Sequence, residues 1–133
     1  MVEPGQPGAR SRARILIVED EAGLAEVLSL HLEAAGHETV ICSDGLAAVY
    51  EVDRQAPDLV VLDLHIPQIS GFRFMQLLRQ RSAVPRIPVV VTTALSFQEA
   101  EDAVRLGADD FMTKPFMPDE LVTRVDRLLE RVR

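Results

Sequence analysis

The stretch Asp58–Pro67, DLVVLDLHIP, decides the fold predicted for this chain. Its four apolar residues, 59–62, are too few for a helix and rich in valine, so they predict a strand buried on both faces of a sheet. The run ends on the carboxylate of Asp63, and Pro67 prevents the strand from simply continuing. A charge at the end of a buried strand is costly unless a neighbouring group uses it. Asp63 is therefore the first candidate functional residue.

Four more strands are predicted on either side of this stretch, from short apolar runs or from alternating apolar and polar residues. They are Ile15–Val18, Glu38–Cys42, Pro88–Val91 and Asp110–Thr113. An amphipathic helix is predicted after each of the five strands. The start and stop signals are Gly36, Ser43 or Asp44, Gly71, Pro85, Ser96, Gly107 and Pro118. The apolar stripes, expected to face the core, are Leu24, Val27, Leu28, Leu32 and Ala35; Leu46, Val49, Tyr50 and Val52; Phe74, Met75 and Leu78; Phe97, Ala100 and Val104; and Leu121, Val125, Leu128 and Val132.

This alternation of strands and helices predicts the α/β fold class. A chain of 133 residues suits a single doubly wound (βα)5 domain, with parallel strands, right-handed crossovers and helices on both faces of the sheet. Residues 1–13 are rich in Gly, Pro and Arg and are expected to form a disordered tail. The folded domain is therefore predicted to span residues 14–133.

Composition narrows the range of functions. The net charge of −7 argues against a general nucleic-acid-binding surface, because attraction to phosphates needs a cationic face. No apolar run approaches the length of a membrane span, and the first residues do not resemble a signal peptide. The one cysteine, Cys42, excludes an intrachain disulfide and fits a reducing compartment, so we expect a cytoplasmic location.

Polar residues gather where four of the predicted strands end. Glu19 and Asp20 follow the first strand, Asp63 the third, Thr93 the fourth and Lys114 the fifth. In an open parallel sheet, ligands bind at these carboxyl ends. If the first and third strands are neighbours, three carboxylates converge, and their repulsion requires a cation such as Mg²⁺. With a hydroxyl and an ammonium group added, the set suits a phosphoryl group, which an aspartate can accept as an acyl phosphate.

Each of these residues also has a structural explanation when taken singly. Asp20 could be a first-turn acid favoured by the helix dipole, Thr93 a strand-end β-branched residue and Lys114 a solvated turn residue. Lys114 is, however, the one lysine among 14 basic residues. The agreement of several residues at the same edge of the sheet favours the functional interpretation.

With these residues in place, the chain resembles the receiver domains of two-component response regulators over about residues 14–132. The matching motifs are Val18–Glu21, Asp63 with Pro67 and Gly71, Val91–Ala94 and Gly107–Phe116. The resemblance implies a flavodoxin-like, chemotaxis-regulator-like fold with strand order 2-1-3-4-5. It also implies a cis peptide bond between Lys114 and Pro115.

The resemblance further implies a role for each residue of the site. Asp63 would be the phosphoacceptor, receiving phosphate from a sensor histidine kinase or a phosphotransfer protein. Mg²⁺ or Mn²⁺ would be held by Asp20, by Asp63, by the backbone carbonyl of His65 and, through water, by Glu19. The side chain of His65 would lie over the phosphate and tune the lifetime of the acyl phosphate.

The remaining implied roles concern signal output. Lys114 would bind the phosphoryl oxygens. Thr93 would shift toward the phosphate, and Phe111, which lacks the hydroxyl of a tyrosine, would turn inward behind it. The readout would be the surface of the fourth helix, fifth strand and fifth helix, which is also a possible homodimer interface.

Two other groups of residues were weighed. His31, His37 and Cys42 have no spacing that matches a zinc site, so exposed or core roles are favoured. Charged residues near the last two helices could form a dimerisation face or could be scattered, solvated charges. They are Arg105, Asp109, Asp110, Arg124 and Arg127.

As a phosphorylation switch, the chain would not be an enzyme, except that it would catalyse its own phosphorylation and dephosphorylation. Two other functions are compatible with parts of the same site. A phosphohydrolase of the haloacid-dehalogenase type would use a second acid two residues after its nucleophile, where this chain has His65, and would carry a cap domain. A receiver-like module that binds partners without phosphorylation would not need the complete pocket. The switch predicts neither membrane insertion nor direct nucleic-acid binding by this domain.

Overall fold

A computed structural model describes residues 12–81, 86–94 and 96–131, in which strands and helices alternate as predicted. The strands are β1 (Arg14–Val18), β2 (Glu38–Cys42), β3 (Leu59–Leu62), β4 (Val89–Thr93) and β5 (Asp110–Thr113). The helices are α1 (Ala22–Ala34), α2 (Gly45–Arg54), α3 (Gly71–Gln80), α4 (Phe97–Arg105) and α5 (Pro118–Arg131). None of the helices in this described part is long and apolar enough to cross a membrane.

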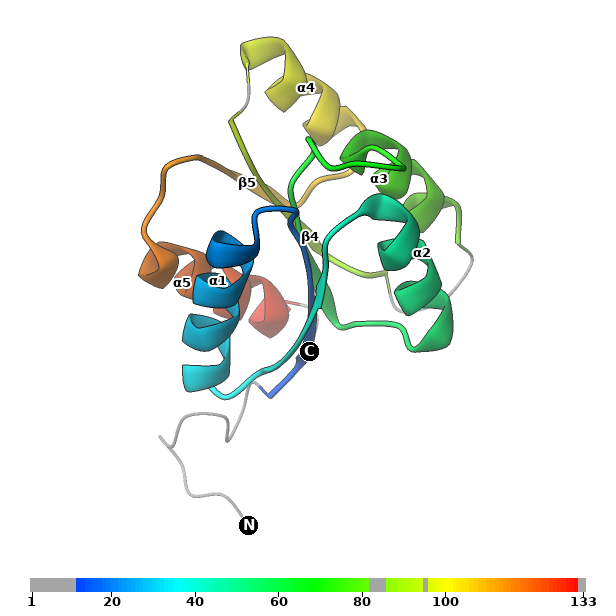
Figure 1. Cartoon of the computed structure of the whole chain (residues 1–133). Helices are drawn as coiled ribbons and strands as arrows, with labels where there is room; N and C mark the ends of the chain where they lie inside the picture. The colour runs from blue at the N-terminus through cyan, green and yellow to red at the C-terminus, as the bar shows by residue number, and fades with distance from the viewer. Residues whose placement is uncertain (1–11, 82–85, 95, 132–133) are drawn as a thin grey trace.

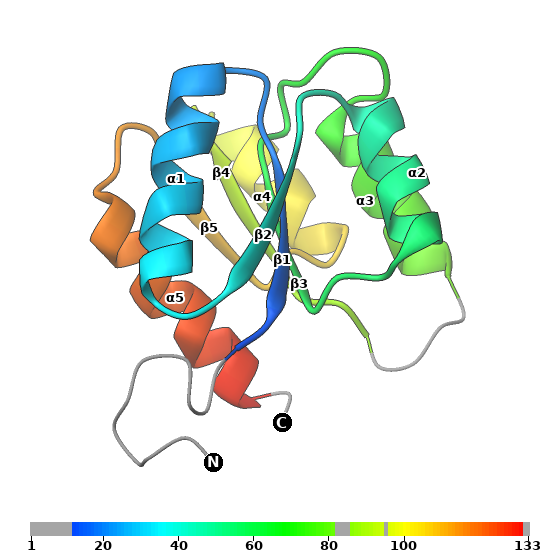
Figure 2. The ribbon, with the colours of Figure 1, turned by 60° about the horizontal axis from the view of Figure 1, so that its bottom comes forward.

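The five strands form one parallel sheet in the order β2-β1-β3-β4-β5, which confirms the predicted topology. Helices α1 and α5 cover one face of the sheet, and α2, α3 and α4 cover the other (Figures 1 and 2). Each face has its own apolar core. The register pairs Val18 of β1 with Leu62 of β3, so the residues that follow these two are neighbours at the same edge.

The central strand β3 is buried as its sequence predicts, since all four of its residues are at most 1% exposed. Its alternate side chains enter different cores: Val60 and Leu62 pack toward α2, α3 and α4, whereas Leu59 and Val61 pack toward α1 and α5. Burial of each such side chain contributes roughly 1.5–3 kcal/mol of hydrophobic stabilisation. The strand that ends at Asp63 is thus anchored on both faces.

The helix boundaries follow local signals in the sequence. The Asp44 side chain caps α2 by accepting a 2.7 Å hydrogen bond from a first-turn backbone N–H. Ser96 and Glu99 form a reciprocal capping box at the start of α4. After α1 and α4, Gly36 and Gly107 adopt a φ of 98°, a conformation that glycine enters without steric cost.

The predicted inward faces of the helices were wrong in part. In α3 the predicted residues Phe74, Met75 and Leu78 are buried, and in α5 so are Leu121, Val125 and Leu128, while Val132 lies outside the described residues. Residues predicted on inward stripes but exposed are Val27, Leu46, Tyr50, Phe97 and Val104. Of the predicted residues in α1 and α2, Leu28, Leu32 and Val52 are buried. Small residues are also buried in α1, α2 and α4, at positions outside the predicted stripes. They are Ala25, Ser29, Ala48 and Ala103.

The residue just before the predicted boundary at residue 14 contacts the folded domain. Ala13 is buried, and its N–H donates a 3.2 Å hydrogen bond to Nδ1 of His37. Because Nδ1 accepts, Nε2 carries the ring proton and donates to Asp126 Oδ1 at 2.7 Å. His37 therefore has a core role that joins β1 to α5. Residues 1–11 of the predicted tail lie outside the described residues.

Asp109, which was considered for a charged dimerisation face, binds within its own chain. Its carboxylate accepts hydrogen bonds from Arg79, Arg86 and the N–H of Val89, at distances of 2.6–3.1 Å. It fastens the end of α3 and the loop before β4 to the start of β5. Asp110 also has an intrachain partner, Arg124, at 2.8 Å. The dimerisation hypothesis therefore loses Asp109.

Gly71, the first residue of α3, gives a prediction for stability. A Cβ atom there would lie 2.4 Å from Leu64 Cα and 2.7 Å from Asp63 O, both backbone atoms that cannot rotate away. Gly71→Ala should lower the free energy of unfolding by about 2 kcal/mol, the typical cost of overpacking, as measured by urea denaturation.

Gly23 of α1 provides the matched control, because a Cβ there meets nothing within 4 Å. Gly23→Ala should raise the free energy of unfolding by roughly 0.5–1 kcal/mol, since alanine favours a helix interior more than glycine does. Equal effects of the two substitutions would contradict the close approach of α3 to the loop after β3.

Candidate functional site

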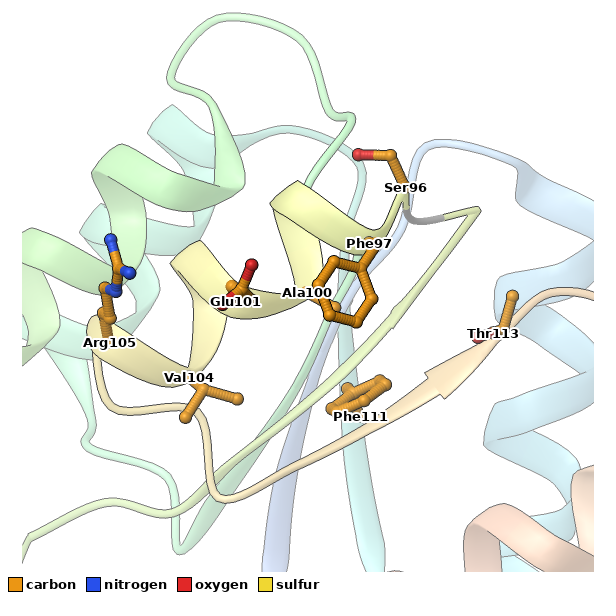
Figure 3. Close-up of a pocket in the computed structure, with 8 residues that line it drawn as sticks. All are labelled: Ser96, Phe97, Ala100, Glu101, Val104, Arg105, Phe111 and Thr113. Atoms are coloured by element: carbon orange, nitrogen blue, oxygen red, sulfur yellow. The ribbon is translucent and has the colours of Figure 1, made fainter.

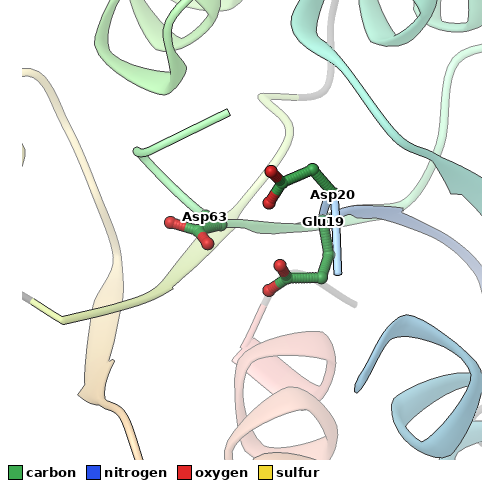
Figure 4. A group of neighbouring side chains, drawn as sticks. All are labelled: Glu19, Asp20 and Asp63. Carbon is green, nitrogen blue, oxygen red and sulfur yellow. The ribbon is translucent and has the colours of Figure 1, made fainter. Parts of the chain in front are cut away.

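Three carboxylates meet at the carboxyl edge of the sheet. Glu19 and Asp20 follow β1 and Asp63 follows β3, and one oxygen from each lies within 4.8 Å of the others (Figure 4). Glu19 and Asp63 are 2% and 4% exposed, whereas Asp20 is open to solvent. The convergence expected from the neighbouring strands β1 and β3 is therefore present.

Backbone hydrogen bonds orient the two buried carboxylates. The N–H of Glu21 donates to Glu19 Oε2 at 3.1 Å, and the N–H of His65 donates to Asp63 Oδ1 at 2.9 Å. The N–H of Asp63 itself continues the sheet by donating to Val18 O at 3.0 Å. Each carboxylate thus has one oxygen held by the chain immediately after it, while the other oxygen faces the centre of the site.

Lys114 reaches those other oxygens from the end of β5. Its Nζ lies 2.8 Å from Glu19 Oε1 and 2.9 Å from Asp63 Oδ2. The backbone at Lys114 is fixed to the end of β4, since the N–H of Lys114 donates to Thr93 O at 3.2 Å. The peptide bond between Lys114 and Pro115 is cis, as the resemblance implied. The ammonium group bridges two carboxylates that come from strands far apart in the sequence.

The pKa directions show which environment dominates at each group. Burial raises the pKa of the Glu19 carboxyl and outweighs the hydrogen bonds from Lys114 and Glu21, which lower it. At Lys114 burial acts to lower the pKa of the amine. Its hydrogen bonds to Glu19 and Asp63 outweigh burial, so the pKa of Lys114 is raised and the side chain stays protonated at neutral pH.

The cluster of Glu19, Asp20, Asp63 and Lys114 carries a net negative charge that a further cation would neutralise. Three carboxylates face one ammonium group, so the cluster is negative when all are ionised. Carboxylate oxygens are hard ligands of the kind that Mg²⁺ and Mn²⁺ prefer. The buried pair with an exposed Asp20 fits a site that is open to water on one side, as Mg²⁺ requires to keep part of its hydration shell. The donor set therefore fits the expected metal.

Thr93 and Phe111 are placed on the side of the site toward α4. Thr93 is 1% exposed at the end of β4. Phe111 of β5 is 38% exposed and lies with Phe97 in a groove of about 570 Å³ between α4 and β5 (Figure 3). The groove is lined by Ser96, Phe97, Ala100, Glu101, Val104, Arg105, Phe111 and Thr113.

Sequence reasoning missed this groove because it placed Phe97 and Val104 in the core. Apolar residues at both positions could have indicated an exposed apolar groove. The periodicity of the sequence does not show, however, that Ala103 is the residue of α4 that faces the sheet. It also missed Glu99, whose Oε2 lies 3.1 Å from Nε2 of His65.

The histidines and the cysteine outside the site have the roles that the absence of zinc spacing favoured. His31 lies half exposed, with Nδ1 2.9 Å from Val27 O. Cys42 is buried at the end of β2, and burial, with the charges of Glu51 and Asp44, raises the pKa of its thiol to about 11. Such a thiol stays protonated and unreactive at neutral pH.

Comparison with known sequences identifies the family. The model of the response regulator receiver domain matches residues 15–126. The chain is 43% identical over 122 residues to the phosphate regulon transcriptional regulatory protein PhoB of Klebsiella pneumoniae, covering 90% of this chain and 52% of PhoB. It is 41% identical over 120 residues to the DNA-binding response regulator MtrA of Mycobacterium leprae, covering 90% of this chain and 52% of MtrA. The chain thus spans about half the length of these relatives, which are signalling proteins rather than enzymes.

Solved structures of receiver domains have the same fold as this chain. The receiver domain of the Francisella response regulator 1452 matches with a TM-score of 0.85 and 28% identity, covering 92% of this chain and all of that one (100%). The receiver domain of the sensor histidine kinase PA1611 from Pseudomonas aeruginosa, solved with a magnesium ion coordinated in its active site cleft, matches with a TM-score of 0.81 and 27% identity, covering 90% and 99% of the two chains. With its parallel sheet in the order 2-1-3-4-5 and its acidic edge, the chain belongs to the response regulator receiver domain family.

Proposed function

We propose that this chain is a phosphorylation switch in which Asp63 accepts a phosphoryl group from a sensor histidine kinase or a phosphotransfer protein. The observation that carries the proposal is the position of the Asp63 carboxylate. It is buried at the end of β3, lies 2.9 Å from the Lys114 ammonium and clusters with the carboxylates of Glu19 and Asp20. Membership of the receiver family supports the same conclusion.

In the transfer step, an oxygen of Asp63 attacks the phosphorus of the donor. The bond between phosphorus and the donor's imidazole nitrogen breaks, its electron pair returns to that nitrogen, and an acyl phosphate forms. Lys114 then binds a phosphoryl oxygen, because it already lies beside Asp63 and its raised pKa keeps it charged. Hydrolysis by water reverses the modification and regenerates the carboxylate.

A divalent cation completes the proposed site. Asp20, Asp63 and the backbone carbonyl of His65 would hold Mg²⁺ or Mn²⁺, with Glu19 acting through water. The ion would offset the negative charge that the phosphoryl group adds to three carboxylates. The magnesium ion in the related PA1611 receiver domain supports this choice.

The proposed readout is the surface of α4, β5 and α5, to which the groove around Phe97 and Phe111 belongs. In the proposed switch, Thr93 moves toward the phosphoryl group and Phe111 turns inward from its half-exposed position. This surface is also the proposed homodimer interface, with Asp110 and Arg124 among its charges. The relatives, a transcriptional regulatory protein and a DNA-binding response regulator, suggest that the signal passes to a transcriptional effector.

The two alternative functions are less well supported. Relatives that are regulators rather than hydrolases argue against a phosphohydrolase of the haloacid-dehalogenase type. An interaction module without phosphorylation would not require Lys114, Asp20 and Glu19 to surround Asp63.

The central prediction concerns Asp63. Incubation with acetyl phosphate and Mg²⁺ should add one phosphoryl group to the native chain, as read from the mass of the intact protein. Asp63→Asn should take up none, because an amide oxygen is too weak a nucleophile to form the acyl phosphate.

Asp119→Asn is the control for this experiment, since the Asp119 side chain is 90% exposed on α5 and away from the acidic cluster. It should be labelled as well as the native chain. Undiminished labelling of Asp63→Asn would refute the assignment, and an unlabelled native chain would favour the interaction module.

A second prediction concerns the metal. Asp20→Asn should weaken Mg²⁺ binding at least about tenfold, because it removes a direct oxygen ligand. Asp20 is exposed and lies among like charges, so the free energy of unfolding without Mg²⁺ should not fall. Isothermal titration calorimetry and urea denaturation measure the two quantities. Glu26→Gln is the control, because Glu26 is an exposed acid of α1. Equal Mg²⁺ affinity in the Asp20→Asn and Glu26→Gln variants would count against Asp20 as a ligand.

A further inference from the structure

His65 and Glu99 connect the phosphorylation site to α4. The backbone of His65 is fastened to Asp63 by its N–H, which lies 2.9 Å from Asp63 Oδ1, so its side chain starts from the edge of the site. The ring is turned toward α4, where its Nε2 lies 3.1 Å from Glu99 Oε2. This contact joins the loop after β3 to the first turn of a helix that lines the α4–β5 groove.

Glu99 is itself held in place by the capping box. Its Oε1 accepts the N–H of Ser96 at 3.2 Å, and its own N–H donates to Ser96 Oγ at 3.2 Å. One carboxylate oxygen therefore secures the start of α4 while the other faces His65. A displacement of His65 would free Oε2 without removing the cap.

We propose that Glu99 is a positioning residue that holds the His65 ring away from Asp63, and that a phosphoryl group on Asp63 competes with Glu99 for this ring. The proposal rests on the proposed function, since it needs the acyl phosphate. It assigns to Glu99 a role that reasoning from the sequence did not foresee.

The energies of the two contacts favour such an exchange. The side chains of His65 and Glu99 are 55% and 29% exposed, and pairs this open to water contribute little to stability. A phosphoryl group on Asp63 adds strong acceptor oxygens close to the His65 backbone, and such an oxygen can accept a hydrogen bond from an imidazole N–H. In the proposed exchange the ring takes this partner in place of Glu99, and α4 loses its side-chain link to the loop after β3.

The exchange affects how long the acyl phosphate survives. Hydrolysis requires the oxygen of a water molecule to attack phosphorus while the bond to the Asp63 oxygen breaks and its electron pair returns to the carboxylate. The attacking water gives its proton to solvent or to the released phosphate. An imidazole ring over the phosphoryl group restricts the approach of that water. Glu99, by retaining the ring, shortens the lifetime of the phosphorylated state.

A double-mutant cycle tests the competition. The native chain, Glu99→Gln, His65→Ala and the double variant are phosphorylated with acetyl phosphate and Mg²⁺, the donor is removed, and decay is followed by intact mass. Glu99→Gln retains the capping box, because glutamine also serves at this position. It should slow decay about two- to fivefold, the range expected for weakening one side-chain contact that is open to solvent.

In the His65→Ala background the same Glu99→Gln substitution should leave the decay rate unchanged, because the ring for which Glu99 competes is gone. Asp102→Asn is the matched control: it removes one carboxylate charge from the same helix, at a position whose side chain accepts from Gln98. It should leave decay at the native rate.

Each other result overturns the proposal in a recognisable way. If Glu99→Gln changes the decay rate equally in chains that keep His65 and in chains that carry His65→Ala, the substitution has a general effect on α4. If Glu99→Gln has no effect, or speeds decay, in the chain that keeps His65, the competition is excluded. In all these cases the chain is still labelled, so the proposed function stands. A native chain that takes up no phosphoryl group would instead overturn the proposed function and this competition together.

Discussion

Two carboxylates that lie almost entirely out of water, Glu19 and Asp63, share one ammonium group, that of Lys114. Burial of an ion costs several kcal/mol, and removal of one partner from such a cluster leaves the others uncompensated. The lysine offsets only part of the cost of burial, which raises the pKa of the Glu19 carboxyl. The edge of the sheet is therefore held in a state that further positive charge would stabilise, and this explains why a divalent cation and a phosphoryl group suit the same place.

This electrostatic arrangement depends on the backbone around it. The carboxylates are adjacent because β1 and β3 are neighbours and Val18 pairs with Leu62, one residue before each acid. The loop after β3 passes so close to the start of α3 that only a glycine fits at position 71. The apolar packing of β3 on both faces anchors Asp63, so the core, together with Lys114, offsets the cost of holding its charge.

The alternation of strands and helices in a parallel sheet could be predicted from the period of the apolar residues, whereas the strand order came from the resemblance to receiver domains. Parallel strands bring their carboxyl ends to one edge, which unites Glu19, Asp63 and Lys114 despite their separation in the sequence. Side-chain orientation on short helices could not be predicted, since α4 buries Ala103 and turns Phe97 to solvent, and apolar residues occur on both of its sides. The inward turn of Asp109 also gave no local signal, because its partners Arg79 and Arg86 and the N–H of Val89 come from other elements.

Two paths lead from Asp63 to the groove between α4 and β5, and they differ in character. Thr93 is buried at the end of β4 and pairs with Thr113 of β5, so its movement would act on the strand that forms one wall. His65 is exposed and Glu99 partly exposed, and their contact reaches the helix that forms the other wall. A buried contact shifts only with its packed neighbours, whereas an exposed pair can exchange partners at little cost. In the proposed switch, one phosphoryl group on Asp63 thus acts on both walls of the groove. It acts on β5 through the buried, tightly packed Thr93 and on α4 through the solvent-accessible contact of His65 with Glu99.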